Sequence, residues 1–166
     1  LYEESMFDGQ KVSKSRIITS VDYSMVSMEA FEIYAANHDI HVMDFVLKLD
    51  AYSYYMMNLL DYLTGNTDRH WGNWGFLVDN RTNQPVRLFD LMDLNQTFLA
   101  YDTPDGANCM TTGNRKMSQR EAAVEAVKNI GLNQKDEIKD EWFKGREKER
   151  EMFWCRFGIL KEQWKA

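Results

Sequence analysis

Cysteine and proline are scarce in this 166-residue chain, with two of each, and glycine is modest at nine. Cys109 and Cys155 fit neither a disulfide framework nor a Cys/His metal spacing, so we expect a reducing, cytoplasmic compartment. The shortage of proline and glycine excludes collagen-like and low-complexity classes. No apolar run reaches the ~18 residues of a membrane helix, and no signal-peptide pattern opens the sequence, so we expect no membrane partner.

Positive charge is also in deficit, with 20 Lys and Arg against 26 Asp and Glu, a net charge of −6. Binding nucleic acid by bulk charge needs clustered cations, so we predict no direct nucleic-acid partner. The length and the 44% hydrophobic content favour one folded domain over residues 1–166. The chain begins with Leu1 instead of Met, so we expect a trimmed or processed chain, or part of a longer one.

Residues 1–19 are predicted to form a strand pair, because the turn signal Asp8-Gly9 separates two extended stretches. A lone two-stranded ribbon is marginally stable in water, so we expect it to pack against another element. Ser27 is a helix cap, since a group of apolar residues follows it.

A long helix is predicted from Val42 to Leu63, where apolar residues recur at three- and four-residue steps. Gly65 is placed to end it. The residues expected to line its buried face are Phe45, Leu49, Tyr52, Met56, Leu59, Leu60 and Leu63.

Two short strands, 74–78 and 86–89, follow and are joined by a turn-rich segment. Residues 101–117 are predicted to be an irregular loop. Ser118 and Glu121 then form a capping box for a helix that Gly131 ends.

The chain from Asp136 onward is highly charged and is predicted to be helical. The sign-alternating run 144–151 is typical of a solvated helix face. The aromatic residues expected to anchor this region are Trp142, Phe143, Phe153, Trp154 and Phe157.

The segment between the long helix and the first of these strands carries most of the candidate chemistry. Asp68 and Asn73 form the pattern D-x-x-x-x-N, which is the interval of the protein-kinase catalytic loop. In that loop the carboxylate accepts the proton of the substrate hydroxyl or orients it, and the amide oxygen binds Mg²⁺. A kinase needs a second metal-binding carboxylate after a short hairpin, and Asp90 and Asp93 both follow the predicted hairpin.

The run from Gly65 to Asn73 reads Gly-Asn-Thr-Asp-Arg-His-Trp-Gly-Asn. It resembles the signature of HipA-type serine/threonine kinases, the toxin kinases of bacterial toxin–antitoxin systems, and phosphoinositide-kinase-like enzymes share its core. The later family segment R-L-A-P-x-Y-D-L aligns with 87–94, so Asp93 takes the place of the metal-binding Asp, and Asp90 that of the family's Pro. The resemblance is sharp over residues 63–95 and diffuse over the rest of 25–160.

This resemblance implies a mainly helical α+β fold, the C-terminal lobe of a protein-kinase-like structure, with a small β-hairpin that carries the site. Asp68 would be the catalytic carboxylate, and Asn73 and Asp93 would hold Mg²⁺ on the phosphates of ATP. Asn66 would fix the entrance of the loop at the nucleotide site. Arg69 and His70 would shape the catalytic loop, His70 by hydrogen bonding. The partners implied are a protein substrate and an antitoxin.

The first 25 residues contain neither a Gly-rich loop nor the strand lysine of a kinase N-terminal lobe. Residues 1–24 would be the last strands of that lobe, and a separate chain could supply the rest. One alternative is therefore a non-catalytic, kinase-derived interaction module. A weaker one is a metal-dependent hydrolase that uses His70 with Asp68 and Asp93.

Three further features favour structural roles. His38 and His41 have no third metal ligand nearby in the sequence. Trp71 and Trp74 are more typical of buried hairpin aromatics than of a base-stacking site. Cys109 lies in a polar loop without an obvious base, so a nucleophilic role is not favoured.

Overall fold

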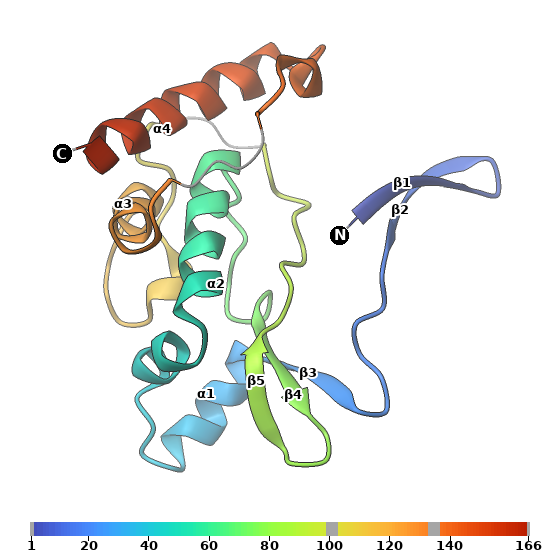
Figure 1. Cartoon of the computed structure of the whole chain (residues 1–166), viewed down its shortest axis with the longest axis vertical. Helices are drawn as coiled ribbons and strands as arrows, with labels where there is room; N and C mark the ends of the chain where they lie inside the picture. Colours follow the sequence, from blue (N-terminus) through green and yellow to red (C-terminus); the bar gives the residue numbers. More distant parts are fainter. Residues whose placement is uncertain (1, 99–102, 133–136, 166) are drawn as a thin grey trace.

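The computed structural model describes residues 2–98, 103–132 and 137–165 of the chain. Within these ranges it is a mixed α/β structure, in which helices predominate and the strands form two small antiparallel sheets (Figure 1). The strands are β1 (Tyr2–Phe7), β2 (Gln10–Ser15), β3 (Tyr23–Ser27), β4 (Gly75–Asp79) and β5 (Gln84–Leu88). The helices are α1 (Met28–Ala36), α2 (Val42–Thr64), α3 (Gln119–Ile130) and α4 (Glu147–Lys165), with short 3-10 turns at Met110–Thr112 and Asp140–Phe143.

None of the helices in these ranges combines the length and the apolar character that a membrane crossing requires. Two sequence predictions fall partly outside the described residues. These are the start of the last helical region at Asp136 and residues 101–102 of the predicted irregular loop.

The strand pair β1–β2 is confirmed, and its turn has positive φ at both Asp8 and Gly9, as a tight hairpin turn requires. The hairpin projects away from the helices (Figure 1). Met6 and Phe7 on it are 61% and 75% exposed. The expected packing of this pair on another element is therefore not seen among the described residues.

A three-stranded antiparallel sheet, in the order β3-β4-β5, lies beside α1 and α2. The two predicted strands are confirmed as β4 and β5, with ends shifted by one or two residues. β3 was not predicted, and it pairs with β4 along its whole length, from Tyr23 opposite Asp79 to Ser27 opposite Gly75. Ser27 also caps α1, as predicted, because its Oγ accepts a hydrogen bond from the N–H of Ala30.

Helix α2 is the central element of the core, and it packs against α3, α4 and β5. The backbone of Asp50 is not helical, and its carboxylate accepts a hydrogen bond of 3.0 Å from the N–H of Leu88 in β5. This kink changes which side of the helix is buried. Tyr52, which was predicted to be buried, is 61% exposed, whereas Tyr54 and Tyr62 are fully buried.

Helix α3 begins at the predicted capping box. Ser118 Oγ accepts from the N–H of Glu121, and the Glu121 carboxylate accepts from the N–H of Ser118 at 2.8 Å. The hydrogen bond from the Ser118 N–H, together with one from the Ser118 hydroxyl, holds the pKa of the Glu121 carboxyl below its ordinary value. The small residues Ala122, Ala123 and Ala126 are buried, which lets α3 approach α2 closely.

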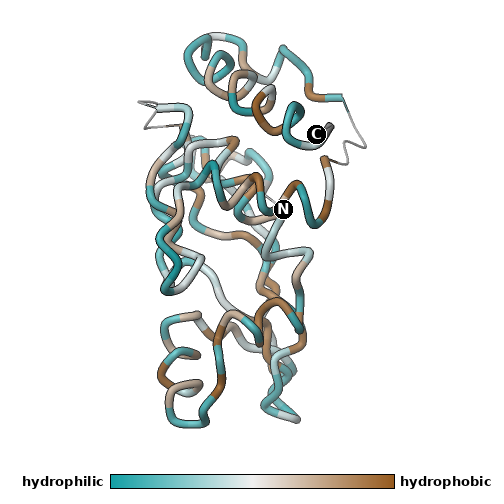
Figure 2. Tube along the Cα trace, turned by 90° about the vertical axis from the view of Figure 1, so that its left-hand side faces the viewer, coloured by the Kyte–Doolittle hydropathy of each residue, from teal (hydrophilic) through white to brown (hydrophobic). Residues whose placement is uncertain are grey.

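Helix α4 alternates hydrophilic and hydrophobic residues along its length (Figure 2). Phe143 in the preceding 3-10 turn and Phe153 in α4 are buried, as predicted. The charged run 144–151 is exposed or half-buried, also as predicted. Trp142 is 61% exposed, so its predicted role as an anchor is wrong.

Helix α4 also buries a charged side chain, that of Arg156, which is 2% exposed. Its Nη1 donates to the carbonyl of Tyr62 at 2.5 Å, and its Nη2 donates to the carbonyl of Thr103 at 3.2 Å. The guanidinium also lies 5.0 Å from the centroid of the Tyr62 ring. The C-terminal helix is thus fixed to the end of α2 that precedes the candidate loop.

Gly75 marks the closest approach of β3 and β4. A Cβ atom at this position would lie 2.1 Å from the carbonyl oxygen of Val26. We therefore expect Gly75→Ala to lower the free energy of unfolding by about 1–3 kcal/mol, because the strands must separate. In the control, Gly158→Ala on α4 meets no atom within 4 Å and should stabilise the chain by roughly 0.5–1 kcal/mol. Urea denaturation measures both, and equal shifts would contradict this strand approach.

Candidate active site

The polar segment 66–73 connects the end of α2 to the start of β4. α2 ends where it was predicted to end, because Gly65 adopts the left-handed conformation, with φ at 65°. Its N–H donates to the carbonyl of Tyr62, and the N–H of Asn66 donates to the carbonyl of Asp61. The chain thus leaves the helix in a fixed direction and enters the loop that carries the candidate catalytic residues.

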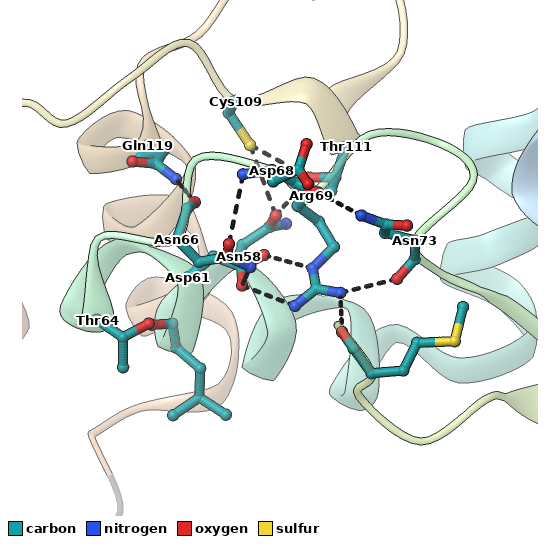
Figure 3. A network of polar contacts seen from close by, with 12 residues as sticks. Asn58, Asp61, Thr64, Asn66, Asp68, Arg69, Asn73, Cys109, Thr111 and Gln119 are labelled. Atoms are coloured by element: carbon teal, nitrogen blue, oxygen red, sulfur yellow. Dashed lines mark hydrogen bonds and ion pairs between the residues drawn. The ribbon is translucent and has the colours of Figure 1, made fainter. Parts of the chain in front are cut away.

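A buried ion pair lies beneath this loop (Figure 3). Arg69 and Asp61 are each 3% exposed. Arg69 Nε donates to Asp61 Oδ2 at 2.9 Å, and Arg69 Nη2 donates to Asp61 Oδ1 at 3.1 Å. This two-pronged geometry is the strongest that an arginine and a carboxylate form, and it holds the loop on the last turns of α2.

The third nitrogen of the same guanidinium joins two parts of the site that are distant in sequence. Arg69 Nη1 donates to the carbonyl of Asn73 at 2.7 Å and to the carbonyl of Met92 at 2.6 Å. Met92 immediately precedes Asp93. One buried side chain therefore holds the backbone of both predicted Mg²⁺-binding residues, Asn73 directly and Asp93 through its neighbour.

Asn66 is completely buried at the entrance of the loop. Its Nδ2 donates to Asp61 Oδ1 at 2.9 Å, its Oδ1 accepts from the N–H of Asp68 at 3.3 Å, and its carbonyl accepts from Gln119 Nε2 at 2.5 Å. These contacts join α2, the loop and α3. Asn66 is therefore a structural residue of the loop entrance, and its side chain is not accessible to a nucleotide.

Asp68 and His70 face each other at the surface of the loop, with side chains 41% and 46% exposed. His70 Nδ1 accepts a hydrogen bond of 3.0 Å from the N–H of Gly72. Because an accepting nitrogen carries no proton, the proton of the neutral ring lies on Nε2, 3.9 Å from Asp68 Oδ1. The hydrogen bond with Gly72 agrees with the expectation that His70 shapes the loop by hydrogen bonding and not by acid–base work.

A hydrogen bond to the loop backbone fixes the side-chain amide of Asn73. Its Nδ2 donates to the carbonyl of Asp68 at 2.8 Å, which fixes the amide because a carbonyl can only accept. Its Oδ1 therefore points the other way, and no hydrogen bond engages that oxygen among the described residues. The side chain is half-buried.

The structure distinguishes Asp93 from Asp90. Asp90 is exposed, and its carboxylate pairs with Arg87 at 2.5 Å. Asp93 is half-buried, has a left-handed backbone with φ at 50°, and has no ion pair with the described residues. Asp tolerates this conformation, which Asp8 and Asp39 also adopt. The two carboxylates therefore differ in that Asp90 has a cationic partner and Asp93 has none among the described residues.

The segment around the 3-10 turn Met110–Thr112 covers the loop from the other side. The indole N–H of Trp71 donates to the carbonyl of Met110 at 2.8 Å. Thr111 donates to Asn58 of α2. Cys109 Sγ lies 3.2 Å from the hydroxyl of Thr111, and burial raises the pKa of this thiol, so a nucleophilic role is not supported.

Sequence reasoning missed the buried polar residues that support the loop, and one signal could have found two of them. Asn58 and Asp61 interrupt the most apolar part of α2 and are three residues apart, which places them on one helix face. Gln119 and the carbonyl of Met92 carry no comparable signal. Trp74 is 4% exposed and belongs to the core, as predicted, whereas Trp71 is half-buried.

The resemblance noted in the sequence assigns Mg²⁺ to two residues of the site. Asn73 and Asp93 supply one amide and one carboxylate oxygen, and Mg²⁺ characteristically takes its other ligands from phosphates and water. No group of three or more His, Cys, Asp or Glu side chains able to hold a metal exists in the described ranges. The hydrolase alternative with His70, Asp68 and Asp93 therefore has no support.

The two other histidines have local partners. His38 Nδ1 lies 2.8 Å from the carbonyl of Tyr34, and its ring stacks on the Tyr34 ring. His41 lies 3.1 Å from the carboxylate of Asp44. Their separate partners agree with the structural roles expected for both.

Comparison of the chain with protein-family models, with curated proteins and with solved structures finds no match. Its function is therefore inferred from the residues and contacts of the site.

The buried pair should be the main stabilising contact of the loop. Asp61→Asn leaves the Arg69 charge buried without a counter-ion, so we expect the free energy of unfolding to fall by about 3–5 kcal/mol. The control is Asp90→Asn, which removes an exposed pair of the same chemistry and should cost at most about 1 kcal/mol. Urea denaturation of both variants tests this, and a loss below 1 kcal/mol for Asp61→Asn would contradict it.

Proposed function

We propose that this chain is the C-terminal catalytic lobe of a HipA-like serine/threonine kinase. The reaction is transfer of the γ-phosphoryl group of ATP to a serine or threonine hydroxyl of a protein. The observation that carries the proposal is the position of Arg69. Its guanidinium donates to the carbonyls of Asn73 and of Met92, the residue before Asp93. Arg69 also directly follows Asp68 in the sequence, so all three residues of the predicted kinase pattern are connected to this one side chain or its neighbouring backbone.

Each residue of the site has a role that its surroundings support. Asp68 is half exposed, so its carboxylate can accept a hydrogen bond from an incoming hydroxyl and orient it. Asn73 and Asp93 bind Mg²⁺ through the oxygens described above. When bound, Mg²⁺ neutralises charge on the phosphates. The chain itself supplies positioning, which is the larger part of catalysis in phosphoryl transfer.

The order of elements also supports the proposal. A long helix, the polar loop, a short hairpin and then Asp93 follow one another, as in the C-terminal lobe of a kinase. The two helical stretches of sequence after residue 118 are similar to the C-terminal helices of HipA-like proteins. This likeness favours a bacterial, cytoplasmic toxin–antitoxin protein with a protein substrate.

A second candidate is a kinase-derived module that binds a partner protein without catalysis. The exposed hairpin β1–β2 favours it, because Met6 and Phe7 lie on a ribbon that this chain leaves open to solvent. The partner would be an antitoxin or a chain that supplies the strands of a kinase N-terminal lobe. The two candidates differ in whether the loop binds nucleotide and metal.

Calorimetric titration with ATP, with and without Mg²⁺, tests the proposal. We expect binding that depends on Mg²⁺, and we expect Asp93→Asn to weaken it at least about tenfold, because one metal-binding carboxylate is lost. Asn tolerates the left-handed backbone at this position, so the substitution removes charge without adding strain.

Asp90→Asn is the matched control and should leave the affinity unchanged. A loss in Asp90→Asn with none in Asp93→Asn would contradict the assignment of the metal ligand. Absence of any binding to the folded chain would favour the interaction module.

A further inference from the structure

A groove of about 500 Å³ lies beside the candidate catalytic loop, where α1, the start of α2 and the segment 112–115 meet. Apolar side chains of Ile40, Met43 and Leu47 form part of its surface, and Trp71 of the catalytic loop also lines it. The groove therefore continues from the loop that bears Asp68.

Trp71 is held firmly at this boundary. Its indole N–H donates to the carbonyl of Met110, and its own carbonyl accepts a hydrogen bond of 3.1 Å from the N–H of Glu29 at the start of α1. The wall shared by the groove and the loop is thus fixed from both sides. Trp71 follows Asp68 by three residues, so the Cα atoms of the two lie at most about 11 Å apart. An extended substrate peptide covers the same distance with about three residues.

The groove carries an excess of negative charge. Glu32, Asp44 and Glu125 line it against one guanidinium, that of Arg115. Arg115 is already paired with Glu125, at 2.9 Å and 3.3 Å. His41 lies beside Asp44, and no cation pairs with Glu32 in the described parts of the chain.

Glu29 adds a further carboxylate at the end of the groove that borders the loop. Its Oε2 lies 3.7 Å from the position that a Cβ of Gly72 would occupy. Acidic side chains are therefore present both in the groove and next to the loop, above an apolar surface. This combination complements a segment that carries lysine or arginine together with an aliphatic residue.

We propose that this groove binds a basic segment of the protein substrate, next to the hydroxyl that accepts the phosphoryl group. The proposal rests on the kinase function proposed above and names the class of its substrate. A substrate cation pairs with Glu32, its aliphatic neighbour packs on Met43 and Leu47, and Trp71 offers a ring face to a second cation. An acidic segment would meet uncompensated like charges.

The test is calorimetric binding of the 166-residue chain to three synthetic nonapeptides at low salt. The first has a central serine with an arginine and a leucine on each side, and the others have glutamine or glutamate in place of arginine. We expect the arginine peptide to bind at least about fivefold more tightly than the glutamine peptide, and the glutamate peptide to bind most weakly. Raising the salt to 0.5 M should remove most of the difference, because surface charges are then screened.

Glu32→Gln should weaken binding of the arginine peptide about two- to fivefold and leave the glutamine peptide unchanged. The matched control is Glu162→Gln, which removes an exposed carboxylate of α4 and should change neither. Helix α4 lies at the opposite end of the molecule from α1 (Figure 1). Equal affinity for all three peptides, or equal losses in the two variants, would overturn the proposal.

The same samples are titrated with ATP and Mg²⁺, which separates this proposal from the kinase assignment. If ATP and Mg²⁺ bind and the arginine peptide does not, the groove is not the substrate site and the kinase assignment stands. If the arginine peptide binds with the expected dependence on Glu32 and ATP does not, the groove is a peptide site and the kinase assignment fails.

Discussion

The arrangement of the site depends on one buried ion pair, between Asp61 near the end of α2 and Arg69 in the following loop. Two charges 3% exposed are costly to desolvate, and the pair persists because further hydrogen bonds satisfy both groups. Asp61 also accepts from Asn66, and Arg69 also donates to two backbone carbonyls. The Arg69 guanidinium thus stabilises the loop by pairing with Asp61, and it also holds together the segments before and after the β4–β5 hairpin.

This support leaves the candidate catalytic groups at the surface. Asp68 and Asn73 are half-buried and His70 is exposed, whereas Asn66 and Arg69, which hold the loop on α2, are buried. The backbone N–H of Gly72 sets the tautomer of His70, and the carbonyl of Asp68 sets the amide of Asn73. Side chains fixed by such hydrogen bonds favour a pre-organised site, in which these side chains are already in place before a substrate binds.

Local signals in the sequence located the elements around the site. Gly65, the capping box of Ser118 and Glu121, and the turn at Asp8 and Gly9 act within a few residues, so the sequence predicts them well. The long-range features could not be predicted in the same way. The pairing of β3 with β4, the contact of Arg69 with Met92 and the burial of Arg156 depend on tertiary packing. The kink at Asp50 likewise follows from a contact with β5, and it moved Tyr52 out of the predicted buried face.

The central claim is that Asn73 and Asp93 belong to one metal–nucleotide site. Mn²⁺ binds the oxygen ligands that Mg²⁺ prefers, and its unpaired electrons broaden the NMR signals of nearby nuclei. In a ¹⁵N-labelled chain titrated with ATP and Mn²⁺, the amide signals of Asn73 and Asp93 should weaken together, while that of Gly9 at the tip of the projecting hairpin stays sharp. Broadening at only one of the two residues, or at neither, would contradict the account.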